Sequence, residues 1–245
     1  METKTVWLDE LTMLEAEEAA KKGAVVILPV GSLEEHGKHL PLSADNLQSE
    51  YIAAEVAKKT GCLVAPAIRY GVCNETRNFP GTISVSFDSL RSMARDVLDE
   101  MVRQGFRRLI VLSGHAGYLH MAALRLAARD VLDKYEGQTE QRALRIVVLC
   151  DYDFAYELRG KQFDERDGHG GEIETSRILA IRPDLVKGRT EKSFSEMPKF
   201  EIVTNPRNYW PSGIRGDPSR ANAENGKIIN EHIISKMLEI VSELS

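Results

Sequence analysis

Four short apolar runs recur along the chain, each nearly continuous in β-branched residues and leucine. They read AVVILPV, CLVAPAI, RLIVLSG and LRIVVLC and occupy residues 24–30, 62–68, 108–114 and 144–150. Unbroken apolar runs of this length are typical of strands that are covered on both faces. The pattern therefore predicts that these segments form the strands of a buried sheet.

Segments with apolar residues at helical spacing lie between and after the runs. The clearest are residues 46–59, 88–104, 118–134 and 222–244. A strand followed by a helix, repeated several times, predicts a mainly parallel sheet with helices on both faces. We expect one α/β domain over residues 1–245, because no linker-like tract divides the chain. The longest irregular stretch, residues 186–226, we interpret as a surface excursion or an oligomer contact.

Composition and charge exclude several classes of partner. The 245 residues include 37 acidic and 32 basic residues, which gives a formal net charge of -5. This balance lacks the basic surplus that neutralises a phosphate backbone, so we expect no nucleic-acid partner. No apolar run approaches the roughly 20 residues that span a bilayer, and the first residues lack the basic and apolar regions of a secretory signal. We therefore expect a cytoplasmic protein with no membrane partner.

The cysteine content and the absence of several catalytic motifs exclude a disulfide framework and some classes of enzyme. Cys62, Cys73 and Cys150 are odd in number and far apart, so we expect buried thiols and not a disulfide framework. The chain has no Gly-x-Ser-x-Gly elbow, His-Glu-x-x-His pair or Cys-x-x-Cys. The commonest serine hydrolases, zincins and thiol redox enzymes are thereby excluded.

Polar clusters follow three of the apolar runs directly. GSLEEHG follows the first run, SGHAG the third and DYDF the fourth. In parallel α/β sheets the reactive groups collect at the carboxyl ends of the strands, which lie at one edge. The sequence thus predicts a site at this edge.

The first cluster contains residue types that commonly bind metal ions. In an extended segment Glu34 and His36 project to one side and Glu35 to the other. Asp45 follows near a helix start, where a carboxylate suits the helix dipole. Each residue alone has an ordinary structural explanation, but carboxylates and imidazoles crowded beside glycines are costly to bury unpaired, and a cation removes that cost. The direction of His39 stays open.

The second cluster, SGHAGYLH, places His115 between two glycines at the end of a predicted strand. We expect His115 to be a metal ligand. The alternative is that the turn holds a phosphate at the helix N-terminus. His120 lies more than a helical turn later and is expected on the helix surface or in its packing.

The third cluster, DGHGGEIETS, contains His169 followed by Glu172 and Glu174 at the start of a predicted helix. Two acids in a first helical turn can be explained by the helix dipole alone. The three glycine-rich turns together, however, hold His36, His39, His115 and His169, which are four of the six histidines of the chain. We therefore predict that they converge on one site.

Together the clusters resemble the creatininase family, also called creatinine amidohydrolases. Residues 31–45 match its signature Gly-Ser-x-Glu-x-His-Gly-x-His-Leu-Pro-Leu-x-x-Asp, and FPGTIS, SGHAG, HGGEIETS and SGIRGDPSRANAENG follow in the family's order. The resemblance covers nearly the whole chain. It implies a three-layer α/β/α sandwich with a mainly parallel central sheet, a homohexameric assembly and two divalent metal ions, zinc, manganese or iron.

The resemblance also assigns roles to residues. It implies that Asp45 bridges the two ions, with Glu34 and His115 on one and His36 on the other. A further glutamate of the family, two residues after the second-cluster histidine, is Gly117 here.

We expect Glu174 to replace the glutamate that is missing at position 117, with Glu172 as the second choice. His169 matches the family histidine that acts as proton donor. His169 and Glu174 are therefore the residues to which we assign catalytic roles.

The implied reaction is hydrolysis of a C–N bond in a small, non-peptide amide or cyclic amide, with metal-bound hydroxide as the nucleophile. Two tryptophans wall the substrate pocket of creatininase proper, and local alignment puts Tyr152 and Glu165 at their places. We expect these two residues to contact the substrate. Thr76 stands where the family often has a histidine.

Two alternatives stay open. Relatives include formamide hydrolases, a peptide-trimming enzyme and sugar-ring hydrolases, so the same site could open a lactone or a cyclic ketone. A different class is a non-catalytic protein that binds a phosphate or nucleotide at its glycine-rich turns. Glu34, Glu35 and Asp45 weigh against that class, because they repel an anion.

Overall fold

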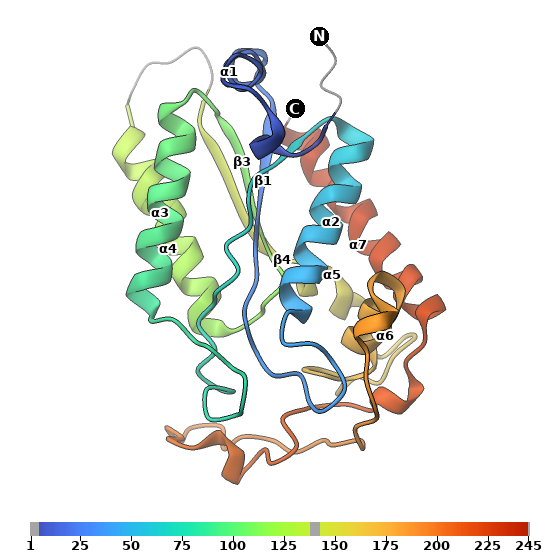
Figure 1. Ribbon diagram of the computed structural model, residues 1–245. Coiled ribbons are helices and arrows are strands. Elements are labelled where there is room, and N and C mark those ends of the chain that lie inside the picture. Colours follow the sequence, from blue (N-terminus) through green and yellow to red (C-terminus); the bar gives the residue numbers. More distant parts are fainter. Residues whose placement is uncertain (1–4, 138–142, 245) are drawn as a thin grey trace.

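The computed structural model describes residues 5–137 and 143–244, which form a parallel sheet between two layers of helices (Figure 1). The strands lie in the order β2-β1-β3-β4. Their bounds are β1 (Val25–Val30), β2 (Leu63–Val64), β3 (Arg108–Ser113) and β4 (Arg145–Cys150). The predicted parallel sheet is confirmed.

The register of the sheet brings the polar clusters together. Val30 pairs with Ser113, and Ser113 pairs with Cys150. The strands β1, β3 and β4 therefore end level with one another. The clusters that follow them must lie at the same edge of the sheet, as the sequence predicts.

Strand β2 is shorter than the apolar run at residues 62–68 predicts. The N–H of Ala65 donates to the carbonyl of Ile27 at 2.9 Å, so the N–H that Pro66 lacks would point away from β1, and the regular ladder ends here. The N–H of Ile68 still donates to the carbonyl of Pro29 at 3.0 Å. The chain thus stays beside β1 and carries residues 69–86 toward the edge where the clusters meet.

Helices cover both faces of the sheet (Figure 1). On one face lie α3 (Phe87–Arg103) and α4 (Tyr118–Tyr135); on the other lie α2 (Ala44–Thr60) and α7 (Ala223–Leu244), with α6 (Glu172–Ile181) packed on α7. This arrangement is the predicted three-layer α/β/α sandwich. The shorter helices are α5 (Tyr152–Ala155), η1 (Leu8–Glu10), η2 (Tyr156–Leu158), η3 (Pro183–Leu185), η4 (Pro206–Asn208) and η5 (Pro218–Arg220).

Helix α1 (Met13–Lys22) was not among the predicted helices, although its start carries a sequence signal. Thr12 accepts the N–H of Glu15 through its side chain, and the Glu15 carboxylate accepts the N–H of Thr12 at 2.8 Å. This is a capping box. Gly23 ends the helix with a φ of 75°, a left-handed conformation that favours glycine.

A single large cluster of buried apolar residues runs through the sheet and both helical layers. We propose on this basis that the chain folds as one domain. None of the described helices is both long and apolar enough to cross a bilayer.

Candidate metal centre

Asp45 lies between two histidines at the centre of the site. It stands in the first turn of α2 and is 1% exposed. Its Oδ1 lies 3.1 Å from Nε2 of His36, and its Oδ2 lies 3.1 Å from Nδ1 of His115. The hydroxyl of Ser32 donates to Oδ2 at 2.6 Å. Each oxygen of one carboxylate therefore faces a different imidazole.

Backbone carbonyls orient both imidazole rings. Nδ1 of His36 lies 3.1 Å from the carbonyl oxygen of Glu34, and Nε2 of His115 lies 3.1 Å from that of Val72. A ring N–H donated to a carbonyl leaves the lone pair on the other nitrogen. In both residues that other nitrogen faces carboxylates, the arrangement that ligating histidines have.

Two glutamates complete the donor groups. Glu34 Oε2 lies 2.9 Å from Nδ1 of His115, and the Thr76 hydroxyl donates to Glu34 Oε1. Glu174 Oε2 lies 3.5 Å from Nε2 of His36 and accepts the N–H of Gly170 at 2.6 Å. Glu34 is thus on the His115 side of Asp45, and Glu174 is on the His36 side.

The sequence left Glu174 and Glu172 as alternatives for the missing ligand, and the structure distinguishes between them. Glu172 turns toward Arg220, with Oε2 3.4 Å from Nε, and belongs to none of the groups of possible ligands. Glu174 points into the cluster. The geometry thus favours Glu174 as the replacement for the family glutamate.

Three groups of described side chains could hold a metal ion, since each brings its ligand atoms within 4.8 Å of one another. They are Glu34, Cys73 and His115; Glu34, His36 and His169; and His36, Asp45 and Glu174. Glu34 Oε2 is also buried without a hydrogen-bond partner. Buried carboxylate oxygens and imidazole nitrogens suit a divalent cation, so the residues fit such an ion.

The charged groups of the cluster shift one another's pKa values. Burial disfavours every charged form here, but Asp45 and Glu174 outweigh it and raise the pKa of His36 well above its usual value. Glu34 and Asp45 do the same to the pKa of His115. The imidazoles in turn lower the pKa of Glu34 to about 2 and that of Asp45 well below its usual value. The carboxylates thus attract positive charge, which a metal ion can supply in place of protons.

His169 lies at the rim of the cluster. Its ring stacks on that of His36 with centroids 4.2 Å apart, and its Nε2 lies 2.7 Å from the carbonyl oxygen of Glu35. Burial and His36 lower the pKa of His169, but Glu34 and Glu35 outweigh them and raise it. The side chain is 18% exposed, so a proton on it is accessible.

Glu35 points away from the donor groups, as strand alternation predicts. Its Oε2 accepts the N–H of Gly37 at 2.9 Å. The carboxylate packs against Gly213, where an added Cβ would lie 2.3 Å from Oε2. Glu35 therefore supports the loop and the carbonyl that holds His169.

His39, whose direction the sequence left open, ties two segments together. Its Nδ1 lies 2.9 Å from the hydroxyl of Thr190 and its Nε2 lies 2.8 Å from that of Thr175. Burial lowers its pKa to about 4, and His36 adds to the effect. Both ring nitrogens lie within hydrogen-bond distance of a hydroxyl, so we assign His39 a structural role. His120 is fully buried, which confirms its expected packing role.

A cavity of about 280 Å³ lies over the donor groups. Beside the predicted residues, its walls include Glu75, Thr76, Tyr118, Tyr156 and Trp210. Trp210 is 7% exposed, and its ring meets that of His169 edge-on at 5.3 Å. The cavity therefore combines an acidic floor with aromatic walls.

Trp210 comes from the segment 186–226, which we interpreted as a surface excursion or an oligomer contact. Part of that interpretation needs correction, because the segment closes one side of the site. Its Ile214 is fully buried and packs against Gly37 and Gly170, where an added Cβ would lie 2.6 and 2.5 Å from the Ile214 side chain. Trp210 and Ile214 are two of several apolar residues in this segment, so no signal in the sequence singles them out.

The structure does not place the two predicted substrate contacts in the cavity. Tyr152 is 2% exposed and packs in the core, where its hydroxyl donates to Gln48 Oε1 at 2.7 Å. Glu165 is exposed to solvent and lies away from the cavity walls. The local alignment therefore selected Tyr152, whereas the tyrosine in the cavity wall is Tyr156, one helical turn later.

Comparison with known proteins identifies the relatives of this site. The family model of creatininase, described as creatinine amidohydrolase, matches residues 9–241. The chain belongs to the creatininase family. It is 29% identical to the creatinine amidohydrolase of Pseudomonas putida over 98% of both chains. It is 31% identical to the mycofactocin precursor peptide peptidase of Mycolicibacterium smegmatis over 86% of this chain and 81% of that one.

Solved creatininases have the same fold as this creatininase-family chain. The manganese form has a TM-score of 0.89, and a mutant of the Zn-Zn type has a TM-score of 0.86, each at 28% identity over 98% of both chains. The resemblance drawn from the sequence motifs and the fold that it implies are thereby confirmed.

The presence of glycine at position 117 of this creatininase-family chain has a steric explanation. A Cβ at that position would lie 2.5 Å from Nε2 of His115. That nitrogen is the one bonded to the carbonyl of Val72. The orientation of the His115 ring thus leaves no room for a side chain at the position of the family glutamate.

Proposed function

We propose that this creatininase-family chain is a metal-dependent hydrolase that cleaves a C–N bond in a small amide or cyclic amide, and that it uses two divalent ions. The position of Asp45 carries the proposal, because its two oxygens face two separate donor groups. Glu34 and His115 would hold one ion, and His36 and Glu174 the other. Zinc, manganese and iron all suit imidazole and carboxylate ligands.

When bound by these residues, the ions would lower the pKa of a water toward neutral pH and polarise the substrate carbonyl. The residues of the site balance the charge and orient the ligating rings. Glu34, Asp45 and Glu174 compensate the positive charge, and the carbonyls of Glu34 and Val72 keep the ligating rings in place.

His169 is the proton donor in this proposal. Burial and His36 lower the pKa of His169, but Glu34 and Glu35 raise it overall, which favours the protonated form of the ring. Its Nε2–H donates to the carbonyl of Glu35, which leaves Nδ1–H to protonate the departing nitrogen. The stacked His36 ring on one side and Trp210 on the other hold the imidazole in a fixed orientation.

The dimensions of the cavity support a small substrate. Its volume of about 280 Å³ lies at the lower end of the range for small-molecule sites. Tyr118, Tyr156 and Trp210 offer flat apolar walls that suit a planar amide or ring. An extended peptide would have to leave most of its length outside.

Metal analysis of the purified protein tests the proposal. We expect two divalent ions per chain in the wild type and a loss of metal in Asp45→Asn. Asp88→Asn is the matched control, since Asp88 stands in the first turn of α3 but is exposed and belongs to none of the groups of possible ligands. Metal-free wild-type protein, or metal content that Asp45→Asn leaves unchanged, would refute the metal centre.

Matched lactams and lactones distinguish the possible reactions. Turnover of the lactams alone supports cleavage of a C–N bond, whereas turnover of the lactones alone supports the alternative of lactone ring opening at the C–O bond. Phosphate binding that survives a chelator and His36→Ala would instead support the non-catalytic class. The four carboxylates that line the cavity, Glu34, Asp45, Glu75 and Glu174, argue against that outcome.

We also propose that copies of this chain form a homo-oligomer, which the family resemblance implies is a hexamer. Phe200 and Ile202 are 90% and 92% exposed on the segment 186–226. Neighbouring exposed apolar side chains favour a protein partner. Sedimentation of the wild type and of Phe200→Ser/Ile202→Ser tests the assembly, and a wild-type monomer would contradict it.

A further inference from the structure

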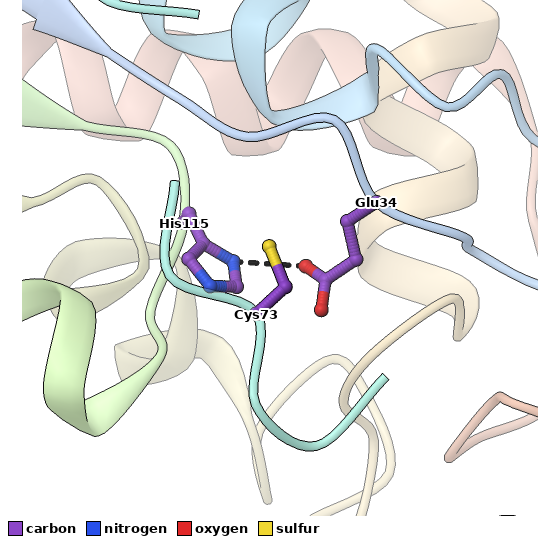
Figure 2. Close-up of side chains that lie close together, drawn as sticks. All are labelled: Glu34, Cys73 and His115. Carbon is purple, nitrogen blue, oxygen red and sulfur yellow. Dashed lines mark ion pairs between the residues drawn. The ribbon is translucent and has the colours of Figure 1, made fainter. Parts of the chain in front are cut away.

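Cys73 lies beside the ion pair of Glu34 and His115, and no role has so far been assigned to it. Its thiol is free and 1% exposed. The Sγ atom, a carboxylate oxygen of Glu34 and a ring nitrogen of His115 lie within 4.8 Å of one another. Figure 2 shows the three side chains entering from different segments, with the sulfur next to the ion pair.

The backbone around Cys73 is held from three sides. The N–H of Val72 donates to Nδ1 of His120 at 3.3 Å, and the carbonyl of Val72 accepts from Nε2 of His115 at 3.1 Å. The N–H of Cys73 donates to the hydroxyl of Ser84 at 2.9 Å. These bonds fix the position of the thiol relative to the imidazole that it faces.

An unsatisfied oxygen indicates that a ligand belongs at this place. Glu34 Oε2 is buried and has no hydrogen-bond partner among the described residues. A buried carboxylate oxygen without a partner is unfavourable and calls for a cation or a donor. Nδ1 of His115 is 2.9 Å away, and in the neutral ring, with Nε2–H bonded to Val72, Nδ1 carries the lone pair. A cation there would meet oxygen, nitrogen and sulfur.

We propose that the Cys73 thiolate is a ligand of the ion held by Glu34 and His115, and that it makes this position prefer zinc over manganese. The inference rests on the metal centre proposed above. Coordination replaces the thiol proton, which goes to solvent, and no redox step is involved.

The two positions of the centre differ in their donors. Thiolate favours zinc, whereas carboxylate and imidazole without sulfur also suit manganese. His36, Asp45 and Glu174 offer only nitrogen and oxygen. We therefore expect the position beside Cys73 to be the selective one of the pair.

Cobalt substitution tests the sulfur ligand directly. The metal-free protein is loaded with Co²⁺, and its absorption spectrum is recorded for the wild type, Cys73→Ser and Cys62→Ser. We expect a near-ultraviolet thiolate-to-cobalt charge-transfer band in the wild type that Cys73→Ser loses and Cys62→Ser keeps. Cys62 is a matched control because it is a buried free thiol ahead of β2, at the opposite end of that strand.

The possible failures are distinguishable. A wild type that binds no cobalt would overturn the metal centre itself. Cobalt bound without the band, or a band that persists in Cys73→Ser, would overturn the role of Cys73 and leave the metal centre intact.

X-ray absorption of the wild-type zinc form gives a measurement that needs no variant. One sulfur at about 2.3 Å from zinc is expected, and a shell of nitrogen and oxygen alone would contradict the inference. In competition between Zn²⁺ and Mn²⁺, we expect Cys73→Ser to lower the preference for zinc by about 10- to 100-fold. An unchanged preference would refute the proposed selectivity.

Discussion

Arg177 and Asp151 form an ion pair in which Nη2 lies 2.5 Å from Oδ2 and neither side chain is exposed to solvent. Asp151 follows β4 directly, and Arg177 lies on α6, one turn after Glu174. Arg177 also donates to Asn230 of α7 at 3.0 Å. The pair therefore links the helix that carries Glu174 to the edge of the sheet.

Removing Arg177 should destabilise the protein strongly. Arg177→Leu leaves Asp151 buried without its partner, and we expect a loss of about 3–5 kcal/mol in the free energy of unfolding. Arg177→Leu/Asp151→Leu should recover part of this loss, because no unpaired charge is left. Urea unfolding measures both. Arg182→Leu is the control, since its pair with Asp184 is exposed and contributes about 0–1 kcal/mol. Equal losses in Arg177→Leu and Arg182→Leu would contradict the prediction.

Glu174 and Glu172 should differ in their effect on metal binding. We expect Glu174→Gln to weaken binding of one ion by at least about 10- to 100-fold, because a charged ligand beside His36 is removed. Glu172→Gln should leave metal affinity unchanged, since that side chain faces Arg220. Titration of the metal-free variants by calorimetry measures both affinities. The reverse order would make Glu172 the ligand.

His169 should affect turnover and not metal content. His169→Gln removes the proposed proton donor, so we expect kcat to fall by about 10²- to 10⁴-fold on a substrate with a poor leaving group. Metal content should stay at the wild-type value. His232→Gln is the control, because His232 pairs with Glu157 away from the site. Loss of metal in His169→Gln would instead place His169 among the ligands.

The metal-free protein should have a defined window of stability in pH. The pKa values of His36 and His115 are raised, so their stabilising contribution is fully present below about pH 6.5 and is lost as pH rises through the raised values. The pKa values of Glu34 and Asp45 are lowered, so their contribution is present above about pH 4 and is lost as pH falls through the lowered values. These four groups therefore contribute most between these limits, while His39 and His120, whose pKa values are lowered to about 4 and about 3, cost stability as pH falls below about 6.5. Thermal unfolding of chelator-treated protein should therefore show greatest stability near pH 6.5 and less on either side.

Metal affinity should change with pH in one direction. The ion competes with the protons on His36 and His115, so affinity rises as pH rises. Zinc titrations between about pH 5 and 8 measure the slope, within the range where imidazole protonation changes. An affinity independent of pH would mean that these histidines carry no proton in the metal-free protein.

The fold could be predicted because its signals are local. Runs of β-branched residues predicted the strands, and the level ends of β1, β3 and β4 brought their polar clusters to one edge. The start of α1 carries a local signal as well, the capping box of Thr12 and Glu15. Strand β2 ended at Val64, and the next bond to β1 after that of Ala65 comes from Ile68, one residue later than regular alternation gives.

The choice between Glu174 and Glu172 needed the packing of a helix. Two residues apart on a helix, they point about 200° away from each other, so only one can face the site. The sequence does not specify the rotation of α6 about its axis. The buried residues Ile173 and Arg177 determine that rotation through their packing.

The sequence by itself determined the parallel sheet, the edge where the chemistry collects and the kinds of ligand that meet there, because these follow from residue type and spacing. Only the tertiary structure decided which side chains from distant segments complete the site. Cys73, Thr76 and Trp210 lie on irregular segments, whose paths depend on contacts such as Ile214 against Gly37 and Gly170. No periodicity encodes such contacts, since they arise when segments far apart in the chain fill one another's space.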